Sequence, residues 1–270
     1  MAKSCIVVGN WKMHKTIEEA VNFVKAAIPL VAKSDVQVYL AVPFTALQAS
    51  VKAAAGSNIV IGAQNMFDAR EGAFTGEIAG RMLVDAGARF VILGHSERRQ
   101  SFHEDDAFIN RKVKAAFEEG LQPILCVGEN ASQRQEGKTE EVLRQQLADS
   151  LEGIKGKQAS SLLVAYEPIW AIGTGNTATP DMAEAAHIFC RAEITDLLGK
   201  VAGSKVPLLY GGSVRPDNGA ALLAQPDIDG LLVGGAALEP TSFAALTQFT
   251  GDNAEPALKP RRRVPKPKSE

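Results

Sequence analysis

Short apolar runs alternate with longer amphipathic segments along this chain of 270 residues. The short runs are rich in β-branched residues and almost continuously hydrophobic, which is typical of parallel strands buried on both faces. Such runs are long enough for strands and too short for helices. Eight strands are therefore expected, at Ile6–Gly9, Gln37–Val42, Ile59–Ala63, Phe90–Leu93, Pro123–Val127, Leu162–Tyr166, Pro207–Tyr210 and Gly230–Val233.

Between these runs, apolar residues recur at helical spacing. Clear helices are expected at Ile17–Val31, Asp105–Glu119, Thr139–Leu151 and Pro180–Leu198. Eight strands alternating with helices predict a closed (β/α)8 barrel. An open, doubly wound sheet is the alternative. It fits less well because the first strand is not followed by G-x-G-x-x-G and because polar clusters follow nearly every strand, not one switch point.

The end of the chain has a different composition. Residues 251–270 hold four prolines, six basic and three acidic residues, which gives a charge of +3. Such a segment has almost nothing to bury. We therefore expect a barrel domain over residues 1–250 and a basic, proline-rich, disordered extension over residues 251–270. The extension is either a solvated tail or a polybasic address or nucleic-acid contact.

Composition narrows the class of protein further. With 46% hydrophobic and 22% charged residues, the chain is ordinary for a globular protein, and its net charge of −2 makes nucleic acid an unlikely partner for the body. Three widely spaced cysteines argue against a disulfide framework or a zinc site. The apolar run at the N-terminus is too short for a signal peptide or a membrane span. We expect a cytoplasmic protein without a membrane segment.

Candidate chemistry lies where the strands end. In a barrel of this kind, function is carried by the loops after the C-terminal ends of the strands. The polar clusters at those positions are Asn10-Trp11-Lys12, His95–Arg99, Cys126–Glu129, Glu167–Trp170, Gly211-Gly212-Ser213 and Gly234-Gly235. A lysine, a histidine and a glutamate thus lie on one rim of the expected barrel. Such a grouping indicates a shared site and not three unrelated surface residues.

These clusters sit in longer motifs that resemble one family. Asn10–Met13, Gly94–Arg99, Ala165–Gly175 and Tyr210–Val214 are similar to the signatures of the triosephosphate isomerases, and the resemblance runs from about Cys5 to Phe249. It implies an intramolecular aldose–ketose isomerase of glycolysis and gluconeogenesis. The enzyme would interconvert dihydroxyacetone phosphate and D-glyceraldehyde 3-phosphate through an enediolate, with no cofactor and no metal.

The resemblance also implies roles for single residues. Glu167 matches the base, and His95 matches the electrophile that acts on the substrate oxygens as a neutral imidazole. Lys12 supplies positive charge, Asn10 is the polar orienting residue, and Glu97 would pair with Lys12. A carboxylate becomes a stronger base when it is desolvated, so a cover over Glu167 is expected.

The phosphate would be held by backbone N–H groups of Gly173, Ser213, Gly234 and Gly235. The two last glycines follow the eighth strand, and the loops after strands seven and eight are the common phosphate site of this fold. Glycine pairs alone are weak signals, because they more often mark ordinary turns.

Residues 168–178 resemble the family's lid. By this resemblance Ile172 and Leu232 would close over the base, and Trp170 would bond to Glu129 when the lid closes. Asn176 stands where lysine is common in the family. This difference affects the expected rate of lid motion and not the expected chemistry.

The connection Gln64–Gly80 is long for a strand-to-helix loop and carries apolar residues among glycines. It resembles the family's interdigitating loop, so the resemblance implies a homodimer in which Thr75 reaches the partner's active site and Glu77 pairs with the partner's Arg98.

A phosphate-binding barrel with another activity, such as an aldolase or a sugar-phosphate epimerase, is the competing class. Those reactions use a Schiff-base lysine on a strand or a set of metal ligands. The sequence offers Lys12 as its rim lysine, and no cluster of histidines and carboxylates has ligand spacing.

Overall fold

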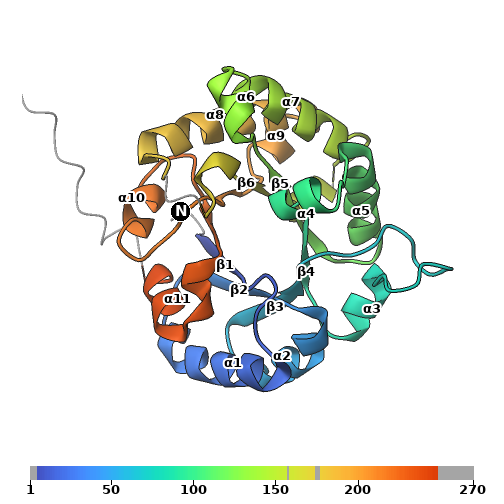
Figure 1. Ribbon diagram of the computed structural model, residues 1–270, viewed down its shortest axis with the longest axis vertical. Helices are drawn as coiled ribbons and strands as arrows, with labels where there is room; N and C mark the ends of the chain where they lie inside the picture. The colour runs from blue at the N-terminus through green and yellow to red at the C-terminus, as the bar shows by residue number, and fades with distance from the viewer. Residues whose placement is uncertain (1–4, 157, 174–176, 249–270) are drawn as a thin grey trace, which may run out of the picture.

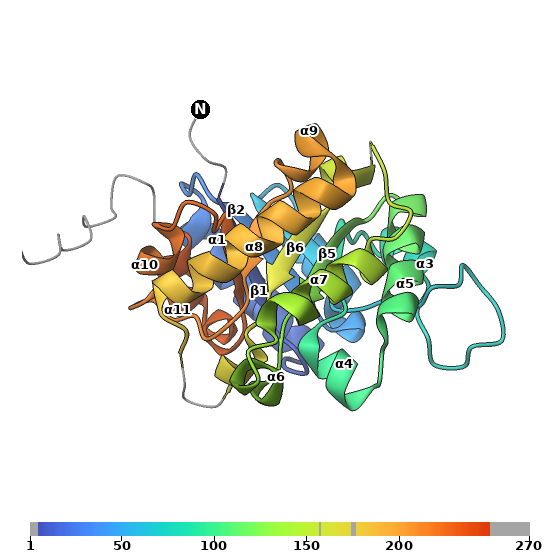
Figure 2. The same cartoon turned by 90° about the horizontal axis from the view of Figure 1, so that it is seen from above.

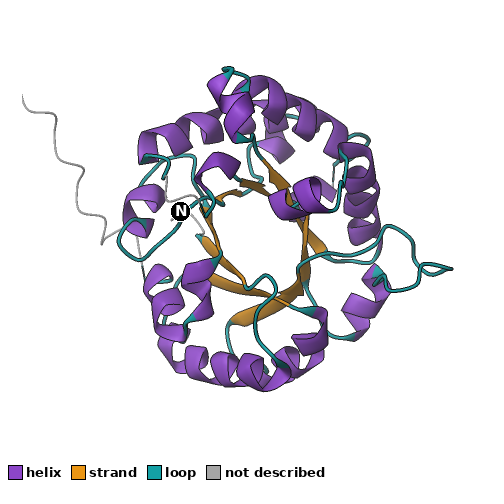
Figure 3. Cartoon of the chain, viewed as in Figure 1, coloured by secondary structure: helices purple, strands orange, loops and turns teal. Residues whose placement is uncertain are grey.

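The computed structural model describes residues 5–156, 158–173 and 177–248 of the chain. Eight parallel strands pair in chain order, β1 to β8, and β1 pairs with β8, so the sheet closes into a barrel. Figure 1 looks down this barrel, and Figure 3 shows the strands inside a ring of helices. The predicted closed (β/α)8 barrel is confirmed. The domain boundary near residue 250 stays a prediction.

The strands lie close to where the apolar runs place them. They are β1 (Ile6–Asn10), β2 (Gln37–Val42), β3 (Ile59–Ala63), β4 (Phe90–Leu93), β5 (Gln122–Val127), β6 (Leu163–Tyr166), β7 (Leu208–Tyr210) and β8 (Gly230–Val233). Four of the eight have the expected bounds, and the other four (β1, β5, β6 and β7) differ by one residue at one end. The hydrogen bonds of the sheet, and not the apolar run, decide the exact ends.

The α-helices lie between the strands. They are α1 (Ile17–Val31), α2 (Leu47–Ala53), α3 (Gly80–Asp85), α4 (Ser96–Ser101), α5 (Asp106–Glu118), α6 (Ala131–Gln135), α7 (Thr139–Ser150), α8 (Pro180–Leu198), α9 (Lys200–Gly203), α10 (Gly219–Leu223) and α11 (Pro240–Leu246). Two of these helices begin at clear caps: Thr16 forms a capping box with Glu19 at the start of α1, and the Thr179 hydroxyl accepts the Met182 N–H at the start of α8. None of the described helices is long and apolar enough to cross a membrane.

Alternate residues of each strand serve two different cores. One set fills the barrel interior, for example Val8, Ile92 and Leu209, and the other packs outward against the helices, for example Val7 and Val91. This two-faced burial explains why the strands are continuously apolar in sequence. The interior is a packed core, so any site must lie at an end of the barrel.

The loops at the carboxyl ends of the strands meet on one edge of the barrel. Figure 2 shows α4 and α6, the short helices that follow β4 and β5, together on that edge. The connection between β3 and α3 projects away from the body in Figures 1 and 2. Its base is pinned by the Phe67 N–H, which donates to the Ile78 carbonyl, while Phe74 packs on Phe67 with ring centroids 4.5 Å apart.

Candidate active site

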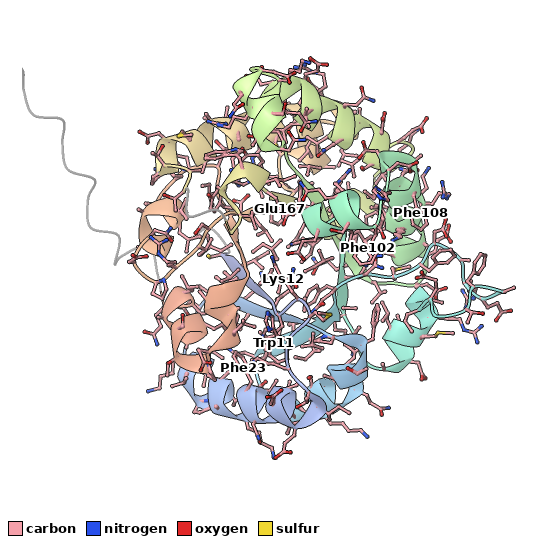
Figure 4. The ribbon with its side chains drawn as sticks, in the orientation of Figure 1. Trp11, Lys12, Phe23, Phe102, Phe108 and Glu167 are labelled. Carbon is pink, nitrogen blue, oxygen red and sulfur yellow. The ribbon has the colours of Figure 1, made fainter. Side chains whose placement is uncertain are left out.

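All eight predicted site residues line one cavity of about 380 Å³ at the carboxyl ends of the strands. This volume suits a small polar ligand. Figure 4 shows Lys12 and Glu167 reaching toward the barrel axis from different parts of the rim. The eight are Asn10, Lys12, His95, Glu167, Gly173, Ser213, Gly234 and Gly235.

Glu167 follows directly after β6 and is buried. Its Oε1 lies 2.9 Å from His95 Nε2, and its Oε2 accepts the backbone N–H of Ser96 at 2.8 Å. Gly211 makes room for this side chain, because a Cβ on that glycine would stand 2.9 Å from Glu167 Cγ. The carboxylate is therefore held against the beginning of α4, in a cavity that any larger residue at position 211 would crowd.

The pKa values of the two residues move in opposite directions. Burial raises the pKa of Glu167, but His95, the Ser96 N–H and Lys12 outweigh burial and hold it below its ordinary value. Burial lowers the pKa of His95, but the adjacent Glu167 carboxylate outweighs burial and raises it. In this conformation Glu167 is a weaker base than desolvation alone would make it. It becomes stronger when it leaves His95.

The ring of His95 has a fixed orientation. His95 is the N-cap of α4, and its Nδ1 accepts the backbone N–H of Glu97 at 3.3 Å. Because Nδ1 accepts, the proton of a neutral ring stays on Nε2, the atom that faces Glu167. The N-terminus of α4 thus opposes the charged form of the ring, and a neutral imidazole is what the sequence analysis expects.

Lys12 has a left-handed backbone, with φ of 53°. Two side chains brace this strained residue: Asn10 Oδ1 accepts its N–H at 3.0 Å, and Gln64 Nε2 donates to its carbonyl at 2.8 Å. Its ammonium pairs with Glu97 at 2.5 Å, as expected. The left-handed backbone of Lys12 is strained, and such strain concentrates at functional sites. The Lys12 side chain lines the cavity.

The opposite side of the cavity is mostly backbone. Gly173 has φ of 70°, which favours glycine. Ser213 lies in a turn shaped by Asn218, whose amide donates to the Ser213 carbonyl at 3.0 Å. The cavity also touches Arg215, but its guanidinium bonds to Asp217 at 3.1 Å. This side of the cavity is therefore lined largely by glycine-rich backbone, and the Arg215 guanidinium is engaged by Asp217.

The first hinge of the predicted lid is anchored through a buried carboxylate. Trp170 Nε1 donates to Glu129 Oε1 at 2.9 Å, and the Tyr166 hydroxyl donates to the same oxygen at 3.1 Å. Arg134 stacks on the indole, 4.4 Å from the ring centroid. Burial beside Glu129 raises the pKa of Tyr166, so this hydroxyl remains a donor. Asn176 lies outside the described residues.

Three features around Glu167 were not predicted from the sequence. The first is the Ser96 N–H, which donates to the Glu167 carboxylate. The Cys126 thiol is buried beside the carboxylate, and burial together with that charge raises its pKa. Arg99 ties the rim together by donating to the carbonyls of Gly94 and Cys126 at 2.8 and 3.1 Å. The Ser96 contact had a detectable signal, since a helix N-terminus beside a candidate carboxylate is an anion site.

The sequence of the chain is similar to that of known proteins over most of its length. The family model described as triosephosphate isomerase matches residues 5–250. The chain belongs to the triosephosphate isomerase family. It is 50% identical over 246 residues to the triosephosphate isomerase of Protochlamydia amoebophila, covering 91% of this chain and 93% of that protein. It is 51% identical over 242 residues to that of Symbiobacterium thermophilum, covering 89% and 94%.

Membership of the triosephosphate isomerase family makes the chain an enzyme of the isomerase class. Within the described ranges, no group of three or more histidine, cysteine or acidic residues could hold a metal ion.

Proposed function

We propose that the chain interconverts dihydroxyacetone phosphate and D-glyceraldehyde 3-phosphate, a step of glycolysis and gluconeogenesis, through an enediolate, with Glu167 as the base. The carboxylate removes a proton from one carbon of the substrate and returns it to the neighbouring carbon. The observation that carries this proposal is that Glu167 and His95 face each other 2.9 Å apart in the cavity that Gly234 and Gly235 also line.

Binding of substrate requires Glu167 to leave His95 and the Ser96 N–H. Loss of these partners removes the main influences that lower the pKa of Glu167 and leaves only Lys12 lowering it, while burial, which raises it, remains. Ile172 and Leu232 line the same cavity and would exclude water from the carboxylate. Substrate thus displaces Glu167 from a resting position and turns it into a stronger base.

His95 acts as the electrophile in this proposal. Once Glu167 has moved, the main influence that raises the pKa of His95 is gone and only Glu97 still raises it, while burial and Lys12 continue to lower it. The neutral ring then donates from Nε2 to the substrate oxygens and moves protons between them. The Lys12 ammonium stabilises the negative charge that develops on the enediolate, and Asn10 holds the backbone N–H of Lys12 in place.

Backbone N–H groups of Gly173, Ser213, Gly234 and Gly235 bind the phosphate dianion in this proposal. Glycines allow the ligand to approach the backbone closely. The lid would cover the enediolate and keep it from losing phosphate.

The competing barrel chemistries are less well supported. An aldolase of the Schiff-base class needs a desolvated lysine at the reacting carbon. Lys12 is instead ion-paired with Glu97 at 2.5 Å. We therefore favour the isomerase over an aldolase or an epimerase.

The test is conversion of dihydroxyacetone phosphate in D₂O. The parent chain should form glyceraldehyde 3-phosphate and incorporate deuterium at the carbon that receives the proton. Glu167→Gln removes the base, so turnover should fall by at least about 1,000-fold, whereas Glu118→Gln, a matched change on the exposed surface of α5, should have no effect. A Glu167→Gln variant with normal turnover would overturn the assignment.

We also propose that the chain is a homodimer joined through the Gln64–Gly80 loop. A second cavity of about 370 Å³, next to the active site, is lined by Asn10, Lys12 and the exposed apolar side chains of Met13, Phe44 and Phe102. Such a surface suits the loop of an identical subunit, with the partner subunit's Thr75 near His95, in an isologous interface.

Sedimentation tests the dimer. Met13 is 95% exposed, so Met13→Glu leaves the fold of one chain intact but would bury a charge in the interface. It should shift the protein toward monomers. Val201→Glu, at an exposed residue of α9, should not. A monomeric parent chain would rule the proposal out.

A cytoplasmic location is proposed from the cysteines. Cys126 and Cys190 are buried free thiols, which suits a reducing compartment.

A further inference from the structure

The segment that carries Gly235 is held at its far end by two side chains from the loop after β1. This segment is a 3₁₀ turn, Gly235–Leu238, which begins at the cavity. Trp11 Nε1 donates to the Ala237 carbonyl at 3.0 Å, and Lys15 Nζ donates to the Leu238 carbonyl at 2.8 Å. The β1 loop thus grips the carbonyl end of a turn whose N–H end faces the active site.

Lys15 reaches this carbonyl from a strained backbone. Its φ is 76°, in the left-handed region that side-chain-bearing residues seldom adopt. Three described non-glycine residues have positive φ, and two of them, Lys12 and Lys15, lie in the same short loop. Strain of this kind persists where the surrounding contacts over-determine the conformation, and it concentrates at functional sites.

The ammonium of Lys15 is further fixed by aromatic rings. Its Nζ lies 4.8 Å from the ring centroid of Phe23 and 5.4 Å from that of Trp11. These two rings pack edge to face, 4.9 Å apart, and Phe23 also contacts Phe243 on α11. Figure 4 shows Trp11 and Phe23 side by side below Lys12. The cation is therefore held in one position, aimed at the Leu238 carbonyl.

We infer that Lys15 is a positioning residue for the phosphate grip: its bond to the Leu238 carbonyl keeps the N–H groups of Gly234 and Gly235 turned toward the substrate phosphate. This inference rests on the proposed function, because it assumes that these groups bind a phosphate. Lys15 touches neither the cavity nor the reacting atoms; it acts through the backbone of the turn.

This role predicts a selective defect. Lys15→Met keeps an unbranched side chain of similar length but loses the ammonium that donates to the Leu238 carbonyl. Loss of one bond from a charged donor should raise KM for D-glyceraldehyde 3-phosphate and lower kcat/KM about tenfold. Turnover of D-glyceraldehyde, which has no phosphate to grip, should be unchanged. A residue that merely stabilised the fold would affect both substrates equally.

Two further variants separate the possible causes. Lys15→Arg keeps a charged donor and should restore most of the activity. Lys25→Met removes an exposed lysine on α1 and serves as the matched control, which should behave like the parent chain.

Binding of inorganic phosphate, measured by calorimetry, repeats the test without turnover, so that failure of the isomerase assignment would not obscure it. Lys15→Met should bind phosphate about tenfold more weakly than the parent, in line with one lost charged bond. Equal losses with both aldehydes, or unchanged phosphate binding, would overturn the inference.

Discussion

The carboxylate of Glu167 lies against the ring of His95, with Oε1 2.9 Å from Nε2. The two groups that the proposed mechanism assigns to opposite tasks are thus each other's partner before substrate binds. Each shifts the pKa of the other, lowering that of Glu167 and raising that of His95. This mutual contact must break before either group can act on a substrate.

The first prediction concerns that contact. His95→Gln replaces an imidazole that can carry charge with a neutral amide, so the pKa of Glu167 in the free enzyme should rise. The acid limb of the pH profile of kcat/KM, which reports the free enzyme, should then move to higher pH. His103→Asn, a change at an exposed histidine, serves as the control. An acid limb that stays in place would mean that His95 does not control Glu167.

The second prediction concerns the first hinge of the lid. Trp170→Phe removes the Nε1–H that donates to Glu129 at 2.9 Å but keeps an aromatic ring on Arg134. A poorly anchored lid should expose the enediolate, which then eliminates phosphate. We expect methylglyoxal and inorganic phosphate to appear beside the normal product. Absence of both products above the parent level would count against a role for this hinge in covering the intermediate.

The third prediction concerns His187, a buried residue of α8 that packs edge-on against Tyr166. Burial lowers its pKa to about 4, against the carbonyls of Ala183 and Leu209, which favour the charged ring. An unfolded histidine titrates near 6.5, so between pH 6.5 and 4 the unfolded chain binds a proton that the folded chain does not. The free energy of unfolding should therefore fall by about 3 kcal/mol across this window.

Replacing His187 by leucine should flatten that loss, even if the variant is less stable at neutral pH. Denaturant unfolding at pH 7 and at pH 4.5, at one protein concentration, measures the difference. His14→Gln, at an exposed histidine, should keep the slope of the parent chain. The same pH dependence in His187→Leu as in the parent would show that His187 does not titrate in this way.

The fourth prediction concerns the basic tail. Residues 252–270 are rich in proline and charge, so their removal should leave isomerase activity and Tm nearly unchanged. A large loss of either would mean that the tail packs on the barrel and that the expected domain boundary is wrong.

Much of the fold was predictable because residues buried on both sides of the sheet form continuous apolar runs in the sequence. A strand such as Phe90–Leu93, buried inside and outside the barrel, has no polar position and stands out from its neighbours. The strand order then brings the rim residues together, which is why His95 and Glu167 could be expected in one site although they lie 72 positions apart.

What sequence could not supply is the direction in which each side chain points. Nothing in the motifs indicates that Lys15 reaches the Leu238 carbonyl, 223 positions away. Such contacts depend on rotamers and on the exact packing of loops. The left-handed backbone of Lys12 and Lys15 likewise has no signal, because turn preferences point to glycine or asparagine at such positions.

The most direct test of the account is the steady-state kinetics of Glu167→Asp with D-glyceraldehyde 3-phosphate. The shorter side chain keeps the carboxylate but withdraws it from the substrate carbon by about 1 Å, so kcat should fall about 100-fold while KM changes little. The phosphate grip is untouched by this change. A Glu167→Asp variant with unchanged kcat would contradict the assignment of Glu167 as the base.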